Sequence, residues 1–228
     1  MNNTPLLRLV WCCLTGILLQ QMACTVLPAQ KDTTQFFILT AASQPPSSSA
    51  STHDPSRREL SVGLGPIDFP GYLKRREIVT RMSGDQLLLS DNKRWAESLD
   101  ANFQRVLSQD LGMQLGTQRI VLFPWYGRPD INYQVEVQVH RFDIASDNLS
   151  HLDARWIIKD GRNGRELMAK ESNISSAVAA TDAAGSEALS GDVNTLSATI
   201  AQSLVGLSEG AETAVKLSNP AAAELAQH

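Results

Sequence analysis

Cysteine is scarce in this 228-residue sequence and absent after residue 24. The three cysteines are Cys12, Cys13 and Cys24. The long remainder of the chain therefore cannot form an internal disulfide, and a packed core has to hold it together. It also lacks thiolates, which most structural zinc sites use as ligands.

Motifs for metal and nucleotide binding are lacking as well. The four histidines do not have the spacing of metal ligands; they are His53, His140, His151 and His228. The sequence contains no phosphate-binding P-loop. Gly63-Leu64-Gly65 could begin a dinucleotide fingerprint, but Asp68 stands where the third glycine should be. We therefore expect a protein with no enzymatic activity, no cofactor and no metal.

Basic residues are too few and too scattered to form a nucleic-acid-binding surface. The chain has 20 Lys and Arg against 24 Asp and Glu, which gives a net charge of −4. Nucleic-acid binding needs clustered positive charge to displace counterions from the phosphates. The composition therefore argues against nucleic acid as a partner.

Long apolar runs are limited to one, from Leu9 to Leu19. Arg8 precedes it and small residues follow near Ala23, which is the layout of a secretory signal peptide. The run is shorter than the roughly 20 residues that a membrane-spanning helix needs. We predict a signal peptide over residues 1–23, and the alternative is a buried N-terminal helix of a soluble domain.

Cys24 stands where cleavage of that signal would fall. An unpaired cysteine in an oxidising compartment is explained if its thiol carries a lipid, since several acyl chains on one residue give stable anchoring. We predict lipidation of Cys24, with residues 24–34 as anchor and tether. Gln21 departs from the lipoprotein pattern, which usually has Leu there, so cleavage after Ala23 or Ala29 to give a soluble periplasmic protein is the alternative. Thr25 favours the outer membrane, with the domain facing the periplasm.

Two stretches have the periodicity of amphipathic helices, one over residues 94–115 and one over residues 189–207. Ser90, Asp91 or Asn92 could cap the first. Short apolar or alternating runs predict strands at 35–40, 60–64, 78–81, 86–89, 119–123, 132–143, 152–159 and 166–175. We expect an α+β domain over residues 35–210, in which a mostly antiparallel sheet packs against two amphipathic helices. Residues 41–58 should form a flexible loop and residues 211–228 a disordered tail.

The segment from Gly65 to Arg81 has the composition of a binding loop. It combines aromatic residues and three consecutive basic residues with prolines that stiffen the chain. Trp125-Tyr126, beside a proline at a strand end, is a second aromatic feature. The alternative is that these aromatics close the core. The interface candidates are Tyr72, Leu73, Arg75, Arg76, Arg81, Trp95 and Trp125.

The chain also resembles a known family, the PqiC-like (YmbA-like) lipoproteins. The resemblance covers about residues 35–207 and rests on motifs that follow in the family's order. They are Phe36-Phe37-x-Leu39, Val62-Gly63-Leu64-Gly65-Pro66-Ile67, Pro70-Gly71-Tyr72-Leu73, Arg75-Arg76-Glu77-Ile78-Val79-Thr80-Arg81, Arg94-Trp95-Ala96-Glu97-x-Leu99 and Arg119-Ile120 with Phe123-Pro124-Trp125. The sequence departs from the pattern at Lys74, where an acidic residue is usual.

The resemblance implies an auxiliary component of an ABC-type, MCE-linked lipid transport system. Such lipoproteins are non-catalytic, are anchored in the outer membrane and dock an inner-membrane MCE-domain protein; a second copy of the chain is a further candidate partner. A stand-alone periplasmic lipoprotein that binds lipid or another small ligand is the main alternative, and an envelope hydrolase is a third. A continuous apolar pocket would favour the ligand binder, and a flat or ring-forming surface the docking subunit.

Overall fold

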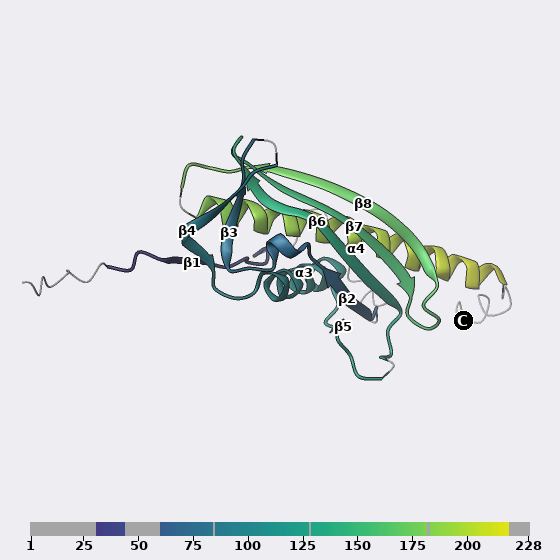
Figure 1. The fold of residues 1–228 in the computed structure, drawn as a ribbon. Coiled ribbons are helices and arrows are strands. Elements are labelled where there is room, and N and C mark those ends of the chain that lie inside the picture. The colour runs from purple at the N-terminus through teal and green to yellow at the C-terminus, as the bar shows by residue number, and fades with distance from the viewer. Residues whose placement is uncertain (1–30, 44–59, 84, 128, 182, 219–228) are drawn as a thin grey trace, which may run out of the picture. The chain divides into compact units, whose positions relative to one another are not determined.

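The computed structural model describes residues 31–43, 60–83, 85–127, 129–181 and 183–218 (Figure 1). The predicted signal peptide, the lipidation site Cys24 and most of the predicted flexible loop lie outside these residues. The described residues from Thr34 onward form one compact unit.

Strand β6 (Tyr133–Ala145) is the centre of the sheet. Its alternating Val135, Val137 and Val139 are buried, as the sequence pattern predicted. On one side β6 pairs antiparallel with β7 (Leu149–Asp160), and β7 pairs antiparallel with β8 (Glu166–Ala177). These hairpins form the longest ladders of the sheet, because both connections are tight turns.

On its other side β6 pairs with two strands in succession, and both pairs are parallel. Strand β2 (Val62–Asp68) lies along its first half and also pairs with β5 (Ile120–Leu122) in parallel. Strand β3 (Glu77–Arg81) meets its end and pairs antiparallel with β4 (Leu87–Trp95). Strand β1 (Gln35–Phe37) then joins β4 in parallel. The sheet is therefore mixed, and its parallel pairs join segments too distant in sequence for local patterns to predict.

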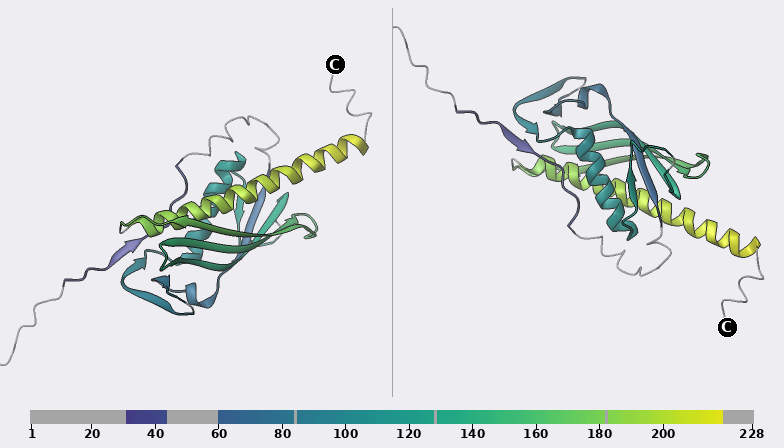
Figure 2. Two further views of the ribbon diagram at one scale, coloured as in Figure 1. Left: turned by 90° about the horizontal axis from the view of Figure 1, so that it is seen from above. Right: turned by 90° about the horizontal axis from the view of Figure 1, so that it is seen from below.

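Two helices cover one face of this sheet (Figures 1 and 2). Helix α3 (Leu99–Leu115) lies against β2 and β5, and α4 (Ala184–Ser218) lies against β6, β7 and β8. The predicted apolar stripes form the core between the layers, since Phe103 and Leu196 are fully buried. The expected α+β class with two amphipathic helices is confirmed.

Helix α3 begins at Leu99 and not near Arg94. Strand β4 continues to Trp95, because its last residues pair with both β1 and β3. Ser90, Asp91 and Asn92 thus lie in a strand, and Ser98 occupies the N-cap position. The helix ends at Gly116, whose φ of 68° is in the left-handed region that favours glycine.

Two further boundaries differ from the expectation. Strand β2 does not stop at Gly65-Pro66 but runs on to Asp68, with a shift in its pairing to β6 at that point. Such a shift lets a strand accommodate proline, which cannot donate to the ladder. Helix α4 continues to Ser218, so the predicted tail is helical as far as that residue, and residues 219–228 lie outside the described part.

Candidate functional site

Tyr72 lies in a short 3-10 helix, η3 (Gly71–Leu73), above the open face of the sheet. Its phenol belongs to a network around Asp143 of β6. Arg81 donates to the Oδ2 atom of Asp143 at 3.1 Å from Nε, and its terminal nitrogen lies 3.0 Å from the same oxygen. Arg141 donates to Oδ1 at 2.8 Å. The Tyr72 hydroxyl lies 3.5 Å from Oδ2 and accepts from Arg81 at 3.3 Å. We call these four residues the Asp143 cluster.

The Asp143 cluster fixes the loop that carries Tyr72. The Asp143 side chain is completely buried, and the two arginine side chains that pair with it are about one-quarter exposed. Burial and the nearby Asp143 charge raise the pKa of the Tyr72 phenol, so this group stays protonated and can donate. Arg81 also lies over the Tyr72 ring, 5.7 Å from its centroid. Tyr72 and Arg81 are therefore engaged within the domain.

Two of the predicted interface residues are core residues. Leu73 is 2% exposed and Trp95 is 3% exposed. Leu73 is the buried residue of η3. Trp95 is the last residue of β4, and its side chain is buried in the core. Their interface role stays a prediction. The alternative that Phe69, Tyr72 and Ile78 close the core fits Phe69 and Ile78, which are buried, whereas Tyr72 is half-buried.

Arg75 and Arg76 are exposed, as expected for interface residues. A terminal nitrogen of the Arg76 side chain donates to the carbonyl of Ala96 at 3.3 Å. The backbone carbonyl of Arg76 accepts a hydrogen bond from the Trp95 amide. Lys74, at the departure from the family pattern, pairs with Asp68 at 3.3 Å. That pair is exposed, so it adds little to stability.

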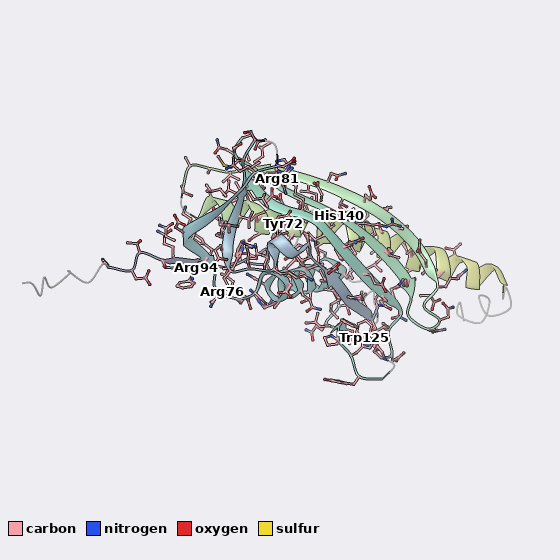
Figure 3. All side chains as sticks on the ribbon, in the orientation of Figure 1. Tyr72, Arg76, Arg81, Arg94, Trp125 and His140 are labelled. Atoms are coloured by element: carbon pink, nitrogen blue, oxygen red, sulfur yellow. The ribbon has the colours of Figure 1, made fainter. Side chains whose placement is uncertain are left out.

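Trp125 lies far from this loop, beyond the end of β5 (Figure 3). It is half-buried, with its ring edge-on to Phe123 at 5.2 Å and against Gly63, where a Cβ would come within 3.2 Å of the indole. Leu122, Phe123 and Tyr126 around it are 42%, 40% and 100% exposed. The apolar run at residues 119–123 favours a buried strand. In the structure β5 is an edge strand, and Leu122 and Phe123 at its end are exposed. We call Leu122, Phe123, Trp125 and Tyr126 the aromatic tip.

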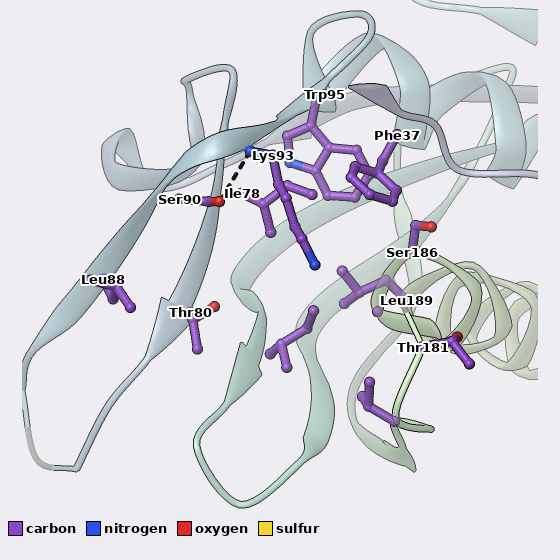
Figure 4. Close-up of a pocket in the computed structure, with 13 residues that line it drawn as sticks. Phe37, Ile78, Thr80, Leu88, Ser90, Lys93, Trp95, Thr181, Ser186 and Leu189 are labelled. Atoms are coloured by element: carbon purple, nitrogen blue, oxygen red, sulfur yellow. Dashed lines mark hydrogen bonds between the residues drawn. The ribbon is translucent and has the colours of Figure 1, made fainter. Parts of the chain in front are cut away.

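A cavity of about 310 Å³ opens at the other end of the sheet (Figure 4). It lies between β1, β3 and β4 on one side and the start of α4 on the other. Exposed apolar residues surround this end, among them Phe36, Ile38 and Leu88. The cavity could not be predicted from local sequence patterns, because its walls come from segments that are distant along the chain.

The described residues contain neither a metal-binding cluster nor a nucleophile elbow. Within them no three His, Cys, Asp or Glu side chains are placed to hold a metal ion together. Gly206-Leu207-Ser208-Glu209-Gly210 matches the letters of a nucleophile elbow. An elbow is a sharp strand-to-helix turn, whereas this segment lies inside α4, where Ser208 donates to the carbonyl of Val205.

The comparisons with known proteins agree with this arrangement. The family model for the ABC-type transport auxiliary lipoprotein component matches residues 39–201. The chain belongs to this family. None of the helices in the described part of the chain is both long and apolar enough to cross a membrane. A search of curated proteins found no match.

Solved structures show the same fold at low identity. Protein XCC0632 from Xanthomonas campestris is 11% identical with a TM-score of 0.61, over 78% of this chain and 99% of that one. The crystal structure of an uncharacterized protein is 18% identical with a TM-score of 0.58, over 75% and 98%. A PelC dodecamer from Paraburkholderia phytofirmans is 13% identical over 63% and 86%, but its TM-score of 0.35 is too low to support an argument about assembly.

Proposed function

We propose that this auxiliary lipoprotein is the outer-membrane subunit of a periplasm-spanning, MCE-type lipid transport system. Acyl chains on Cys24 anchor it, its domain faces the periplasm, and it docks an inner-membrane-anchored MCE-domain protein without catalysing a reaction. The observation that carries the proposal is the family match over residues 39–201, because the family is that of transporter auxiliary components.

Two features of the domain support a docking role. The aromatic tip combines Tyr and Trp, which are preferred at the centres of interfaces, and Tyr126 is fully exposed. Its backbone is held at Phe123, since the Phe123 amide donates to the Leu64 carbonyl at 2.9 Å and Gln104 donates to the Phe123 carbonyl at 2.9 Å. A surface already fixed in place loses little entropy on binding. Arg75 and Arg76 offer donors for partner carboxylates on a second surface.

Site-specific cross-linking tests the docking. A photo-reactive amino acid at Tyr126, in cells that express the full chain, should give an adduct that mass spectrometry identifies as an MCE-domain protein. The same amino acid at Asn163, in the exposed β7–β8 turn, is the control and should not. Adducts with a second copy alone would replace docking by self-association, and no adduct at Tyr126 would remove the aromatic tip from the proposal.

Anchoring is tested separately. Cys24→Ala should abolish incorporation of a palmitate analogue and release the protein from the membrane fraction, because the acyl chains supply the anchoring energy. Cys13→Ala, inside the predicted signal peptide, is the matched control and should still be labelled. A wild-type protein that takes up no label would rule out lipidation of Cys24.

A further inference from the structure

The exposed large apolar side chains of the described residues gather at two places. One is the aromatic tip. The other is formed by β1, the residue after it and β4, which contribute Phe36, Ile38, Leu88 and Leu89, each between 39% and 59% exposed. We call these four residues, together with Arg94, the β1–β4 edge. The strand order runs β1-β4-β3-β6-β2-β5, so the two groups lie at opposite edges of the sheet (Figure 1).

Arg94 adds a positive charge to the β1–β4 edge. It pairs with Phe36 of β1 and with Glu77 of β3 in the strand register, so these three side chains share one side of the sheet. Arg94 lies at the end of the domain where β1 joins it (Figure 3). Within the described residues Arg94 forms no ion pair, and its buried Nε atom has no acceptor. The terminal nitrogens of its half-buried side chain are therefore available to an external anion.

The chain enters the domain at this same edge. Strand β1 begins at Gln35, eleven residues after the predicted lipidation site Cys24. Eleven fully extended residues span at most about 40 Å, so acyl chains on Cys24 keep β1 within that distance of the lipid surface. The aromatic tip follows β5, at the opposite edge of the sheet. Of the two exposed apolar groups, the β1–β4 edge is therefore the one that the anchor holds beside the membrane.

A phospholipid surface offers matching chemistry to this edge. Its headgroup layer accepts apolar side chains to a depth of about 5–10 Å. Its phosphates accept two parallel hydrogen bonds from one guanidinium group. Exposed apolar patches occur at contacts with membranes or with proteins, and the anchor favours the membrane. Once the domain is tethered, a further contact with the same surface is an intramolecular event and costs little additional entropy.

We propose that the β1–β4 edge lies against the phospholipid surface that carries the anchor. Its four apolar side chains enter the headgroup layer, and Arg94 pairs with a lipid phosphate. The aromatic tip then faces away from this membrane, on the side from which a partner approaches. This orientation rests on the proposed anchoring at Cys24, whereas the lipid contact is a property of the domain itself.

A fluorescent reporter measures which part of the domain touches lipid. The mature chain carries Cys24→Ser and an N-terminal histidine tag, which holds it on vesicles through a nickel-chelating lipid in place of acyl chains. The vesicles contain phosphatidylethanolamine and phosphatidylglycerol, some with brominated acyl chains. Leu88→Cys then supplies the only thiol for the label, and bromine should quench this label strongly. Asn163→Cys, in the exposed β7–β8 turn, is the control and should be quenched little.

Flotation of the untagged Cys24→Ser chain with the same vesicles separates the apolar from the basic contribution. Phe36→Ser removes an inserted ring and should lower the ratio of bound to free protein about tenfold. Arg94→Gln should lower it about fivefold, as loss of one basic residue near an anionic surface does. The matched controls, Tyr126→Ser at the aromatic tip and Arg165→Gln in the β7–β8 turn, are exposed and should leave it unchanged.

The results distinguish the lipid contact from the anchor. Urea melts show whether each variant is folded, and Leu88→Ser replaces Phe36→Ser if that variant is not. A Leu88 reporter quenched no more than the Asn163 reporter, or equal vesicle binding by Phe36→Ser and Tyr126→Ser, would overturn the contact. Shielding of the Leu88 reporter by a protein partner but not by lipid would make the edge a protein contact instead. A quenched Leu88 reporter in a protein that takes up no palmitate analogue would support the lipid contact and remove the anchor.

Discussion

The loop that carries Tyr72 and the aromatic tip that carries Tyr126 have similar compositions but are held in different ways. Tyr72 is joined to β6 through Arg81 and the buried Asp143. Tyr126 is completely exposed, although the backbone at Phe123 beside it is fixed. The two tyrosines thus differ in whether another part of the chain supplies partners for the side chain, and aromatic composition alone does not predict this difference.

The largest expected loss of stability comes from the aromatic core that the Tyr72 loop packs against. Phe103 of α3 packs edge-on against Phe69 of this loop at 5.2 Å and against Phe142 of β6 at 5.4 Å. Phe103→Ala should therefore lower the free energy of unfolding by about 3–5 kcal/mol, as large-to-small changes in a core do. Urea denaturation measures this loss. Leu122→Ala at the aromatic tip is the control, and a loss below about 1 kcal/mol for Phe103→Ala would mean that this contact does not anchor the loop.

Loss of the Asp143 carboxylate should have the next largest effect on the free energy of unfolding. Asp143→Ala leaves the two guanidinium groups of Arg81 and Arg141 partly buried without their carboxylate. Breaking a buried pair in this way costs about 3 kcal/mol. The exposed Asp68, which pairs with Lys74, is the comparison, and Asp68→Ala should cost less than about 0.5 kcal/mol. Equal losses in the two variants would show that the Asp143 cluster adds no more than a surface ion pair.

Asp192, a buried acid on the helix face, should make the stability of the domain depend on pH. Asp192 of α4 accepts a hydrogen bond from Ser176 at 2.5 Å. Burial raises its pKa above the ordinary 3.8, and hydrogen bonds from Ser176 and Ser150 only partly oppose this. The folded state therefore binds this proton more tightly than the unfolded chain does. Its contribution to stability is complete below pH 3.8 and is lost as the pH rises through the raised pKa.

Asp192→Asn should therefore flatten the dependence of the unfolding free energy on pH. Relative to this variant, the wild type should lose stability as the pH rises from about 3.8 through the raised pKa of Asp192. Urea melts at several pH values measure the difference. Asp85→Asn, at an exposed carboxylate, is the control. A wild type that gains stability over this window relative to Asp192→Asn would contradict the assignment.

The sequence predicted those parts of the fold that local patterns specify. The predictions of apolar stripes on α3 and α4 and of alternating residues in β6 were correct. Burial of one face of a helix or strand makes apolar residues recur at a fixed spacing along the sequence. The predicted start of α3 near Arg94 was wrong, because β4 continues to Trp95 through its pairing with β1, which lies far away in the sequence. The Asp143 cluster was missed for the same reason, since Tyr72 and Asp143 are 71 residues apart. Of the predicted interface residues, Leu73 and Trp95 are buried, and their interface role, like that of Arg75, Arg76 and Trp125, stays a prediction.

The smallest expected change in stability belongs to the aromatic tip, and it gives the sharpest test of the comparison. Tyr126→Ser removes a side chain that is 100% exposed, so the unfolding free energy should stay within about 0.5 kcal/mol of the wild type. If the tip docks a partner, the same change should weaken assembly by about 2 kcal/mol, as loss of a hot-spot tyrosine does.

Tyr72→Ser should do the reverse: it lowers stability by about 1–2 kcal/mol through the Asp143 cluster and leaves the affinity of the folded protein for its partner unchanged. Sedimentation of the assembled complex beside urea melts of each variant measures both quantities. Weaker assembly in Tyr72→Ser at full stability would place the Tyr72 side chain itself in the interface. Unchanged assembly in Tyr126→Ser would show that exposure of the tip does not reflect docking.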